Sequence, residues 1–113
     1  MCGIIGISSN KSVSANIINS LKKLEYRGYD SAGVATLFDG EINEVKSEGR
    51  VDNLEQNFDL KSLKGNIGIG HVRWATHGVP NSINAHPHSS DNVSVVHNGI
   101  IENSTILKKY LIN

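Results

Sequence analysis

The only cysteine of the chain, Cys2, directly follows Met1 and precedes the apolar, glycine-rich run 3–7. A small side chain at position 2 permits removal of the initiator methionine, which would leave a residue carrying both a thiol and a free α-amine. Such an amine has a reference pKa near ~7.7–8 and accepts a proton at neutral pH. A nucleophile and its general base would then share one residue, and no separate histidine is needed. The alternative is that Cys2 is a small buried hydrophobe.

A second group of polar side chains follows a glycine-rich stretch at the start of a loop. Arg73 can hold a carboxylate through two parallel hydrogen bonds, and Thr76 and His77 can add donors. The alternative is a surface arginine beside a capping threonine. Trp74, the only tryptophan of the chain, is either a core residue or a lid over a carboxylate pocket.

The dipeptide Asn98-Gly99 also has two interpretations. Asn-Gly favours positive φ and is typical of a tight turn. Alternatively, the Asn98 side-chain amide and the Gly99 N–H form an oxyanion hole. Acyl transfer to a thiol needs such a pair of donors, and losing one raises the barrier by ~2.7–4 kcal/mol.

Two further segments carry clustered polar residues. The pair His86 and His88 flanks Pro87 and could bind a transition metal, although a catalytic site usually needs a third protein ligand. Further ligands could be recruited from His71, His77, His97 and Asp91, but their spacings match no metal motif. A role of His86 and His88 as polar scaffolding of a long loop is therefore favoured. In the segment 26–33, Arg27 and Asp30 form either a buried pair or a network that positions Cys2.

Composition excludes several classes of protein. The chain has 113 residues, with eleven basic and eleven acidic side chains, and no basic run that a nucleic-acid partner would require. This length fits one domain with a modest core. One cysteine cannot form an internal disulfide, the apolar start is too short for a signal peptide, and no stretch is long enough for a membrane helix. The expectation is a cytoplasmic protein whose thiol stays reduced.

Hydrophobic periodicity predicts a mixture of helices and strands that must position these side chains. Strands are expected at 3–8, 32–38, 41–46, 66–73 and 93–97. Helices are expected at 13–24, 52–58 and from 103 or 104 to 111. Ser12 or Ser14 is the expected N-cap of the first helix, Arg27-Gly28 its stop, Asp39-Gly40 a hairpin turn, and 74–92 a long polar loop. No βαβ regularity indicates a parallel sheet.

Two expectations concern packing. The glycines within 66–73 predict a close approach of other groups to that strand. Ile106, Leu107 and Leu111 form a helix face that needs a cover, and nothing in the sequence follows to supply one, so the chain is predicted to be cut within a domain.

Five segments together resemble the glutaminase domain of the class II glutamine amidotransferases, along almost the whole chain. They are 1–6, 26–33 (Tyr-Arg-Gly-Tyr-Asp-Ser-Ala-Gly), 71–78 (containing Arg-Trp-Ala-Thr-His-Gly), 84–88 and 96–103. Within this family they are most similar to the branch that transfers ammonia to fructose 6-phosphate and makes glucosamine 6-phosphate. The purine-pathway amidophosphoribosyltransferases share the Cys-Gly start, but they usually differ after the arginine and many carry a propeptide.

The resemblance implies a catalytic role for three residues. Cys2 would attack the side-chain amide of glutamine, with its own α-amine as general base. Asn98 and Gly99 would form the oxyanion hole. The products would be a γ-glutamyl thioester and ammonia, and then glutamate after hydrolysis.

The resemblance also implies which residues bind glutamine. Arg73 would hold the α-carboxylate, with Thr76 and His77 beside it, and Trp74 would gate the route of ammonia to the second site. Arg27 and His86 would have supporting roles. No cofactor and no metal is implied.

The implied fold is α+β, an N-terminal-nucleophile (Ntn) hydrolase sandwich of four layers, α/β/β/α, with antiparallel sheets. Residues 1–113 would be only the N-terminal part of the glutaminase domain, because the family's domain is roughly twice this long and continues into two sugar-isomerase domains. Fructose 6-phosphate would bind those absent domains, and the full-length protein would be a homodimer. Two alternatives remain open: the glutaminase domain of another amidotransferase, and an inactive fragment that folds poorly.

Overall fold

The computed structural model describes every residue except 1, 75–78, 80 and 113. Its strands are β1 (Gly3–Ser8), β2 (Ser31–Phe38), β3 (Glu41–Glu48), β4 (Ile67–Arg73), β5 (His88–Ser90) and β6 (Val93–Val95). Its α-helices are α1 (Ser14–Leu24), α2 (Asp52–Asn57) and α3 (Ser104–Ile112), and its short 3₁₀ helices are η1 (Glu25–Arg27) and η2 (Leu60–Ser62). In the described part of the chain, no helix has the length and apolar character needed to cross a membrane.

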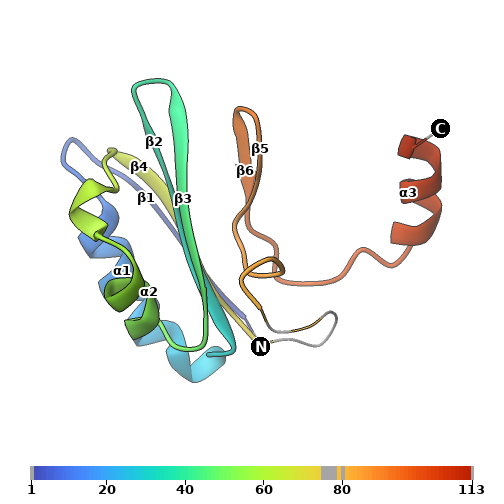
Figure 1. The fold of residues 1–113 in the computed structure, drawn as a ribbon, viewed down its shortest axis with the longest axis horizontal. Coiled ribbons are helices and arrows are strands. Elements are labelled where there is room, and N and C mark those ends of the chain that lie inside the picture. Colours follow the sequence, from blue (N-terminus) through green and yellow to red (C-terminus); the bar gives the residue numbers. More distant parts are fainter. Residues whose placement is uncertain (1, 75–78, 80, 113) are drawn as a thin grey trace.

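The elements form successive layers. Strands β1 to β4 make an antiparallel sheet in the order β1-β4-β2-β3, with α1 and α2 on one side of it. The antiparallel pair β5–β6 lies on the other side, and α3 stands beyond it (Figure 1). The order helix, sheet, sheet, helix matches the expected α/β/β/α sandwich, with a second sheet of two strands among the described residues.

The core lies between α1 and the four-stranded sheet. Ile17 and Leu21 are fully buried and point at the glycines of β4. A Cβ atom built on Gly68 or Gly70 would lie only 2.6 Å from the Ile17 side chain. The predicted close approach at this strand is therefore confirmed, and its cause is the helix α1 packing directly on the sheet.

Strand alternation divides β4 between the two faces of the sheet. Because Gly68 and Gly70 face α1, residues 69, 71 and 73 face the opposite side, toward β5–β6. Residue 3 pairs with residue 72 and residue 4 with residue 71, so Ile4 shares this second face with His71. Cys2 lies two positions before Ile4, and the same alternation brings it to the second face beside Arg73.

The hairpin β2–β3 forms as the sequence predicts. Asp39 and Gly40 have φ values of 53° and 76°, the positive pair that a two-residue type I′ turn requires. The predicted strands and the short helix at 52–58 are likewise found, with boundaries shifted by a few residues.

Two local predictions were wrong. Helix α1 begins at Ser14 with Val13 as N-cap and no side-chain capping bond among the described residues, because the Ser14 hydroxyl donates to the Leu60 carbonyl at 3.3 Å instead. The segment 74–92 is not loop throughout: it contains β5, which turns at Asp91 (φ 46°) into β6, and β6 ends at Val95.

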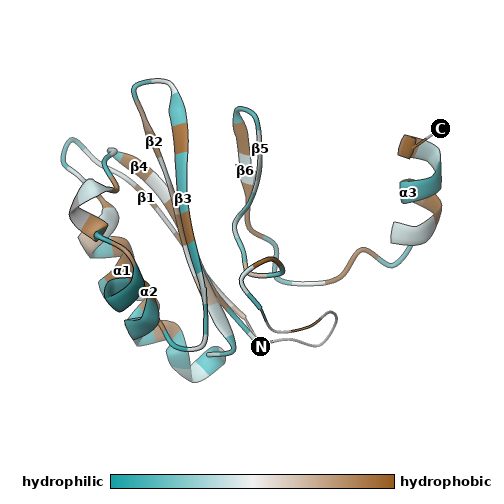
Figure 2. Cartoon of the chain, in the orientation of Figure 1, coloured by the Kyte–Doolittle hydropathy of each residue, from teal (hydrophilic) through white to brown (hydrophobic). Residues whose placement is uncertain are grey.

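The predicted uncovered helix face is confirmed in α3. Ile106 is 70% exposed and Leu111 78% exposed, and no residue of this helix is buried. Figure 2 shows apolar residues on α3 that stand clear of the rest of the ribbon.

Candidate active site

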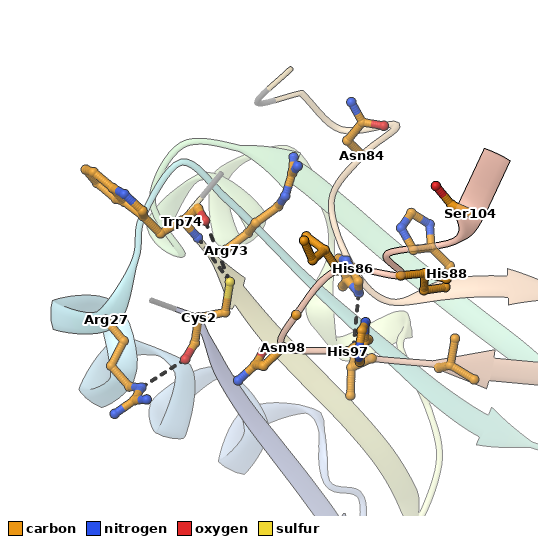
Figure 3. Close-up of a pocket in the computed structure, with 15 residues that line it drawn as sticks. Cys2, Arg27, Arg73, Trp74, Asn84, His86, His88, His97, Asn98 and Ser104 are labelled. Carbon is orange, nitrogen blue, oxygen red and sulfur yellow. Dashed lines mark hydrogen bonds between the residues drawn. The ribbon is translucent and has the colours of Figure 1, made fainter. Parts of the chain in front are cut away.

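A cavity of about 1060 Å³ opens on the second face of the sheet, where β1 starts and β4 ends (Figure 3). Five parts of the chain form its wall: the chain start, η1, the end of β4, the segment 84–88 and the segment 95–104. The lining residues that matter for the chemistry are Cys2, Arg27, Arg73, Trp74, Asn98 and Gly99.

Cys2 is held at the start of β1 by backbone contacts. Its Sγ accepts a hydrogen bond from the Trp74 backbone N–H at 3.4 Å and lies 3.8 Å from the Trp74 carbonyl oxygen. The Arg27 Nε donates to the Cys2 carbonyl oxygen at 2.9 Å. These contacts fix Cys2 at the edge of the cavity.

The segment 26–33 thus contacts Cys2 through Arg27, as the predicted network around Cys2 would require. The helical run ends at Gly28, and the chain turns back so that the Asp30 N–H donates to the Arg73 carbonyl at 3.0 Å. This bond joins the segment to the end of β4, and it places Arg27 against the start of β1.

Arg73 is 8% exposed and lines the cavity. Its Nη1 donates to the Val79 carbonyl at 3.2 Å, and the Asn84 side-chain amide donates to the same oxygen at 2.9 Å. The arginine thus faces the cavity from a strand end that its own contacts fix. Thr76 and His77 lie outside the described residues.

Trp74 is not a core residue, because it is 45% exposed at the cavity rim. Its ring meets the Tyr29 ring edge-to-face, with centroids 5.5 Å apart. The Arg50 guanidinium lies over the Tyr29 ring, 4.7 Å from its centroid. Figure 3 shows the indole turned away from Cys2. In this position it lies at the cavity entrance rather than over the sulfur.

Asn98 and Gly99 lie at a bend after β6 and line the cavity opposite Cys2. The alternative interpretation as a tight turn of positive φ does not hold, because Asn98 is not in the positive-φ region and the pair forms a bend from which the chain runs on toward α3. The Asn98 Oδ1 lies 2.8 Å from Nε2 of the buried His71. This contact leaves the nitrogen end of the Asn98 amide as the end available to a ligand.

Three histidine rings stack against one another, and two of them, His86 and His88, line the cavity while His71 lies behind it. His86 lies face-to-face on His71 with centroids 4.4 Å apart, and His88 tilts against His86 at 4.5 Å. Burial lowers the pKa of both His71 and His86 to about 4, so both rings are neutral at pH 7, and burial also lowers the pKa of His88. No cluster of three or more His, Cys, Asp or Glu side chains in the described ranges could hold a metal ion.

A glycine on β2 admits this stack. A Cβ atom built on Gly33 would overlap the His86 carbonyl oxygen and press on the Pro87 ring. Since Gly33 pairs with His71 across β2 and β4, the chain around His86 lies directly over the buried histidine. The His97 N–H, which donates to His86 Nδ1 at 3.3 Å, joins this stack to the segment that carries Asn98 (Figure 3).

Sequence reasoning found most of the cavity wall but missed the partnership of His71 with Asn98. It treated His71 only as a recruitable metal ligand. The available signal was strand alternation, which puts His71 on the same face as Arg73 two positions later. The role of Asn84 in fixing the loop beside Arg73 was also missed.

Known proteins resemble this chain in sequence and in fold. No protein-family model matches the chain. Proteins named glutamine–fructose-6-phosphate aminotransferase (isomerizing) match almost all of it, at 57% identity over 112 residues in Mesorhizobium japonicum and 59% over 113 residues in Clostridium acetobutylicum. These matches cover 99% and 98% of this chain but only 18% and 19% of the length of those relatives.

Solved structures share the fold. The glutamine phosphoribosylpyrophosphate amidotransferase from B. subtilis, complexed with ADP and GMP, superposes with a TM-score of 0.82 at 29% identity. A structure described as the allosteric regulatory enzyme of purine biosynthesis superposes with a TM-score of 0.84 at 30% identity. Each superposition includes 99% of this chain but only 25% of the length of the solved structure. By sequence and by fold, the chain belongs to the glutamine–fructose-6-phosphate aminotransferase family and has the α+β fold of Ntn-hydrolase glutamine amidotransferase domains.

Proposed function

We propose that this chain carries the glutamine-hydrolysing site of an amidotransferase, with Cys2 as the nucleophile. The observation that supports this most directly is the meeting of Cys2, Arg73 and Asn98 around one cavity, although they come from three separate parts of the chain. A sulfur, a cation for a carboxylate and an amide donor are the groups that glutamine hydrolysis by a thiol needs.

In the proposed reaction the free α-amine of Cys2 takes the thiol proton, and the sulfur attacks the side-chain carbonyl carbon of glutamine. The carbonyl oxygen becomes an oxyanion that the Asn98 amide and the Gly99 N–H stabilise. The protonated amine gives its proton to the leaving nitrogen, and ammonia departs from a γ-glutamyl thioester. Water then attacks the thioester carbon, and the C–S bond breaks to release glutamate and restore the thiol.

The glutamine backbone end is proposed to bind Arg73 through its α-carboxylate, with Thr76 and His77 as further contacts. Arg73 is suited to this role because its guanidinium is nearly buried, where a charge-assisted pair is strong. Trp74 is proposed to gate the exit of ammonia from the cavity. Arg27 and His86 support the site through Cys2 and through the histidine stack.

For the whole protein we propose the reaction L-glutamine + D-fructose 6-phosphate = L-glutamate + D-glucosamine 6-phosphate. The relatives at 53–59% identity carry this activity in their name, whereas the purine-pathway alternative rests on structures at 29–30% identity. Residues 1–113 would be the N-terminal part of the glutaminase domain. Fructose 6-phosphate would bind sugar-isomerase domains elsewhere in a homodimeric protein, in the cytoplasm, where a reactive thiol stays reduced.

The first test is the intact mass of the purified chain before and after exposure to an electrophilic glutamine analogue. Loss of Met1 together with one adduct on Cys2 is the expected result. Retention of Met1 with an unreactive Cys2 would contradict the proposal, because a blocked amine cannot act as the base.

The second test measures turnover in a chimera whose residues 1–113 replace the matching segment of the Clostridium acetobutylicum relative. We expect release of glutamate from glutamine at a rate near that of the relative, and loss of this release in Cys2→Ala. Glutamate release that survives Cys2→Ala would assign the activity to another group.

A further inference from the structure

We propose that His71 is a positioning residue that fixes the side chain of Asn98 so that its amide N–H₂ group faces the cavity. This inference rests on the proposed function of the site. It adds a residue that does not line the cavity and therefore does not touch the substrate.

The contact is short, and its His71 end is buried. His71 has no exposed surface, and its Nε2 lies 2.8 Å from the Oδ1 of Asn98, which is exposed at the cavity. Breaking this bond would leave the buried Nε2 of His71 without a partner. The wall of the cavity thus has a rigid support behind Asn98.

The chemistry of the His71 imidazole and the Asn98 amide fixes the direction of this hydrogen bond. An amide oxygen only accepts, so the imidazole must carry its proton on Nε2. His71 Nδ1 is buried and has no hydrogen-bond partner among the described residues. The opposite tautomer would place an N–H at that unpartnered position, so the Nε2–H form is favoured. With the oxygen held by His71, the nitrogen of the Asn98 amide must point the other way.

The histidine stack keeps the His71 ring from tilting. His86 covers its face at 4.4 Å with an interplanar angle of 23°. His86 is itself held by the His97 N–H, one residue before Asn98, so the ring and the amide that it orients share one support. Burial keeps both rings neutral at pH 7, which preserves one donor and one acceptor on each.

The test uses two substitutions in the chimera described above. His71→Gln keeps an N–H donor near the position of Nε2, whereas His71→Leu removes the donor at similar size. We expect His71→Leu to lower kcat for glutamine hydrolysis about 100-fold with little change in KM, because the oxyanion forms only in the transition state. His71→Gln should recover most of this loss.

A double-mutant cycle shows whether His71 acts through Asn98. Once Asn98→Ala has removed the amide, His71→Leu should lower kcat by no more than about twofold. Val72→Ala, the next residue on β4, faces the core and measures the effect of core damage alone. The proposal is overturned if the losses from His71→Leu and Asn98→Ala multiply, or if His71→Gln is as slow as His71→Leu.

A spectroscopic measurement covers the case in which the chimera shows no Cys2-dependent hydrolysis and the proposed function fails. In ¹⁵N-histidine NMR spectra of the same chimera, a neutral His71 with its proton on Nε2 and a shift of that signal in Asn98→Ala support the inference. A proton on Nδ1, or a signal insensitive to Asn98→Ala, overturns it.

Discussion

Cys2 and Arg27 meet through the peptide backbone, since the guanidinium binds the carbonyl oxygen of Cys2 and not its sulfur. The buried His71 supports Asn98 in a similar way, from a position that does not line the cavity. At the scale of single residues, the site therefore consists of groups that would react and a second set that holds them in place.

Removing the guanidinium should loosen the nucleophile. In Arg27→Ala we expect the rate of Cys2 modification by an electrophilic glutamine analogue to fall by about 10-fold, because a charged hydrogen bond contributes ~1.5–3 kcal/mol. The measurement is a time course of adduct mass in the chimera. Lys23→Ala, which removes an exposed cation from α1, serves as the control. Equal rates in Arg27→Ala and the parent would show that the bond to the Cys2 carbonyl does not position the sulfur.

The buried histidines should make the fold sensitive to acid. Unfolded histidine has a pKa of 6.5, and burial lowers the pKa of His71 and His86 to about 4, so the unfolded chain binds more protons between these values. Stability is then full above about pH 6.5 and falls as the pH drops toward 4. Urea unfolding of the chimera at several pH values measures this, and His71→Gln should give a shallower decline. If stability falls just as steeply with pH in His71→Gln, protonation of His71 does not contribute to the acid sensitivity.

At the scale of elements, β4 organises the molecule, because its two faces serve different purposes. Its glycines let α1 pack closely, and its alternate residues supply His71 and Arg73 to the site. On the second face, Gly33 of the neighbouring strand β2 likewise allows close packing, because the His86 backbone lies where a Cβ atom would be.

Adding one methyl group at Gly33 should separate these layers. We expect Gly33→Ala to destabilise the chimera by ~1–3 kcal/mol and to reduce glutamine hydrolysis, because the Cβ must displace the His86 carbonyl and with it the histidine stack. Gly6→Ala is a matched control on β1, where the nearest atom lies 3.9 Å from the new Cβ. Thermal unfolding and kcat compare the two variants. Equal stability and equal kcat in the two variants would show that the backbone at His86 can shift to accommodate the methyl group without loss of stability or activity.

Local signals account for what sequence analysis could predict of these elements. Alternation and the Asp39-Gly40 turn were enough to predict the β2–β3 hairpin. The three polar residues of β5 carry no hydrophobic alternation, so that strand was missed. The bond between His71 and Asn98 joins residues 27 positions apart, and it depends on where a bend brings the chain back to the sheet. Strand alternation places His71 on the face of the sheet that carries Arg73, but no local signal identifies Asn98 as its partner.

At the scale of the whole molecule, one half of the sandwich is packed and the other is open. Apolar side chains on the second sheet face and in β6 are about half exposed, and those on α3 more so: Leu37, Ile67, Val93, Val95, Ile106 and Leu111. Exposed apolar surface of this extent usually marks a missing partner.

The isolated 113-residue chain should therefore unfold without a sharp cooperative transition and should bind a hydrophobic dye such as ANS. We expect the chimera, in which further chain is available to cover these residues, to unfold cooperatively and to bind little dye. Circular dichroism during heating and dye fluorescence distinguish the two. A sharp transition in the isolated, monomeric chain would show that the packed half is stable by itself.

The backbone that flanks the Cys2 sulfur belongs to Trp74, 72 positions further along the chain. A ribosome adding ~5–20 residues per second needs roughly 4–14 s to make that stretch. During this interval Cys2 has no Trp74 to contact, whereas in the folded chain it is bound by both Arg27 and Trp74. The proposed mechanism needs Met1 to be removed, and we expect this removal to occur before the backbone of Trp74 packs against Cys2, while the amino terminus is still accessible.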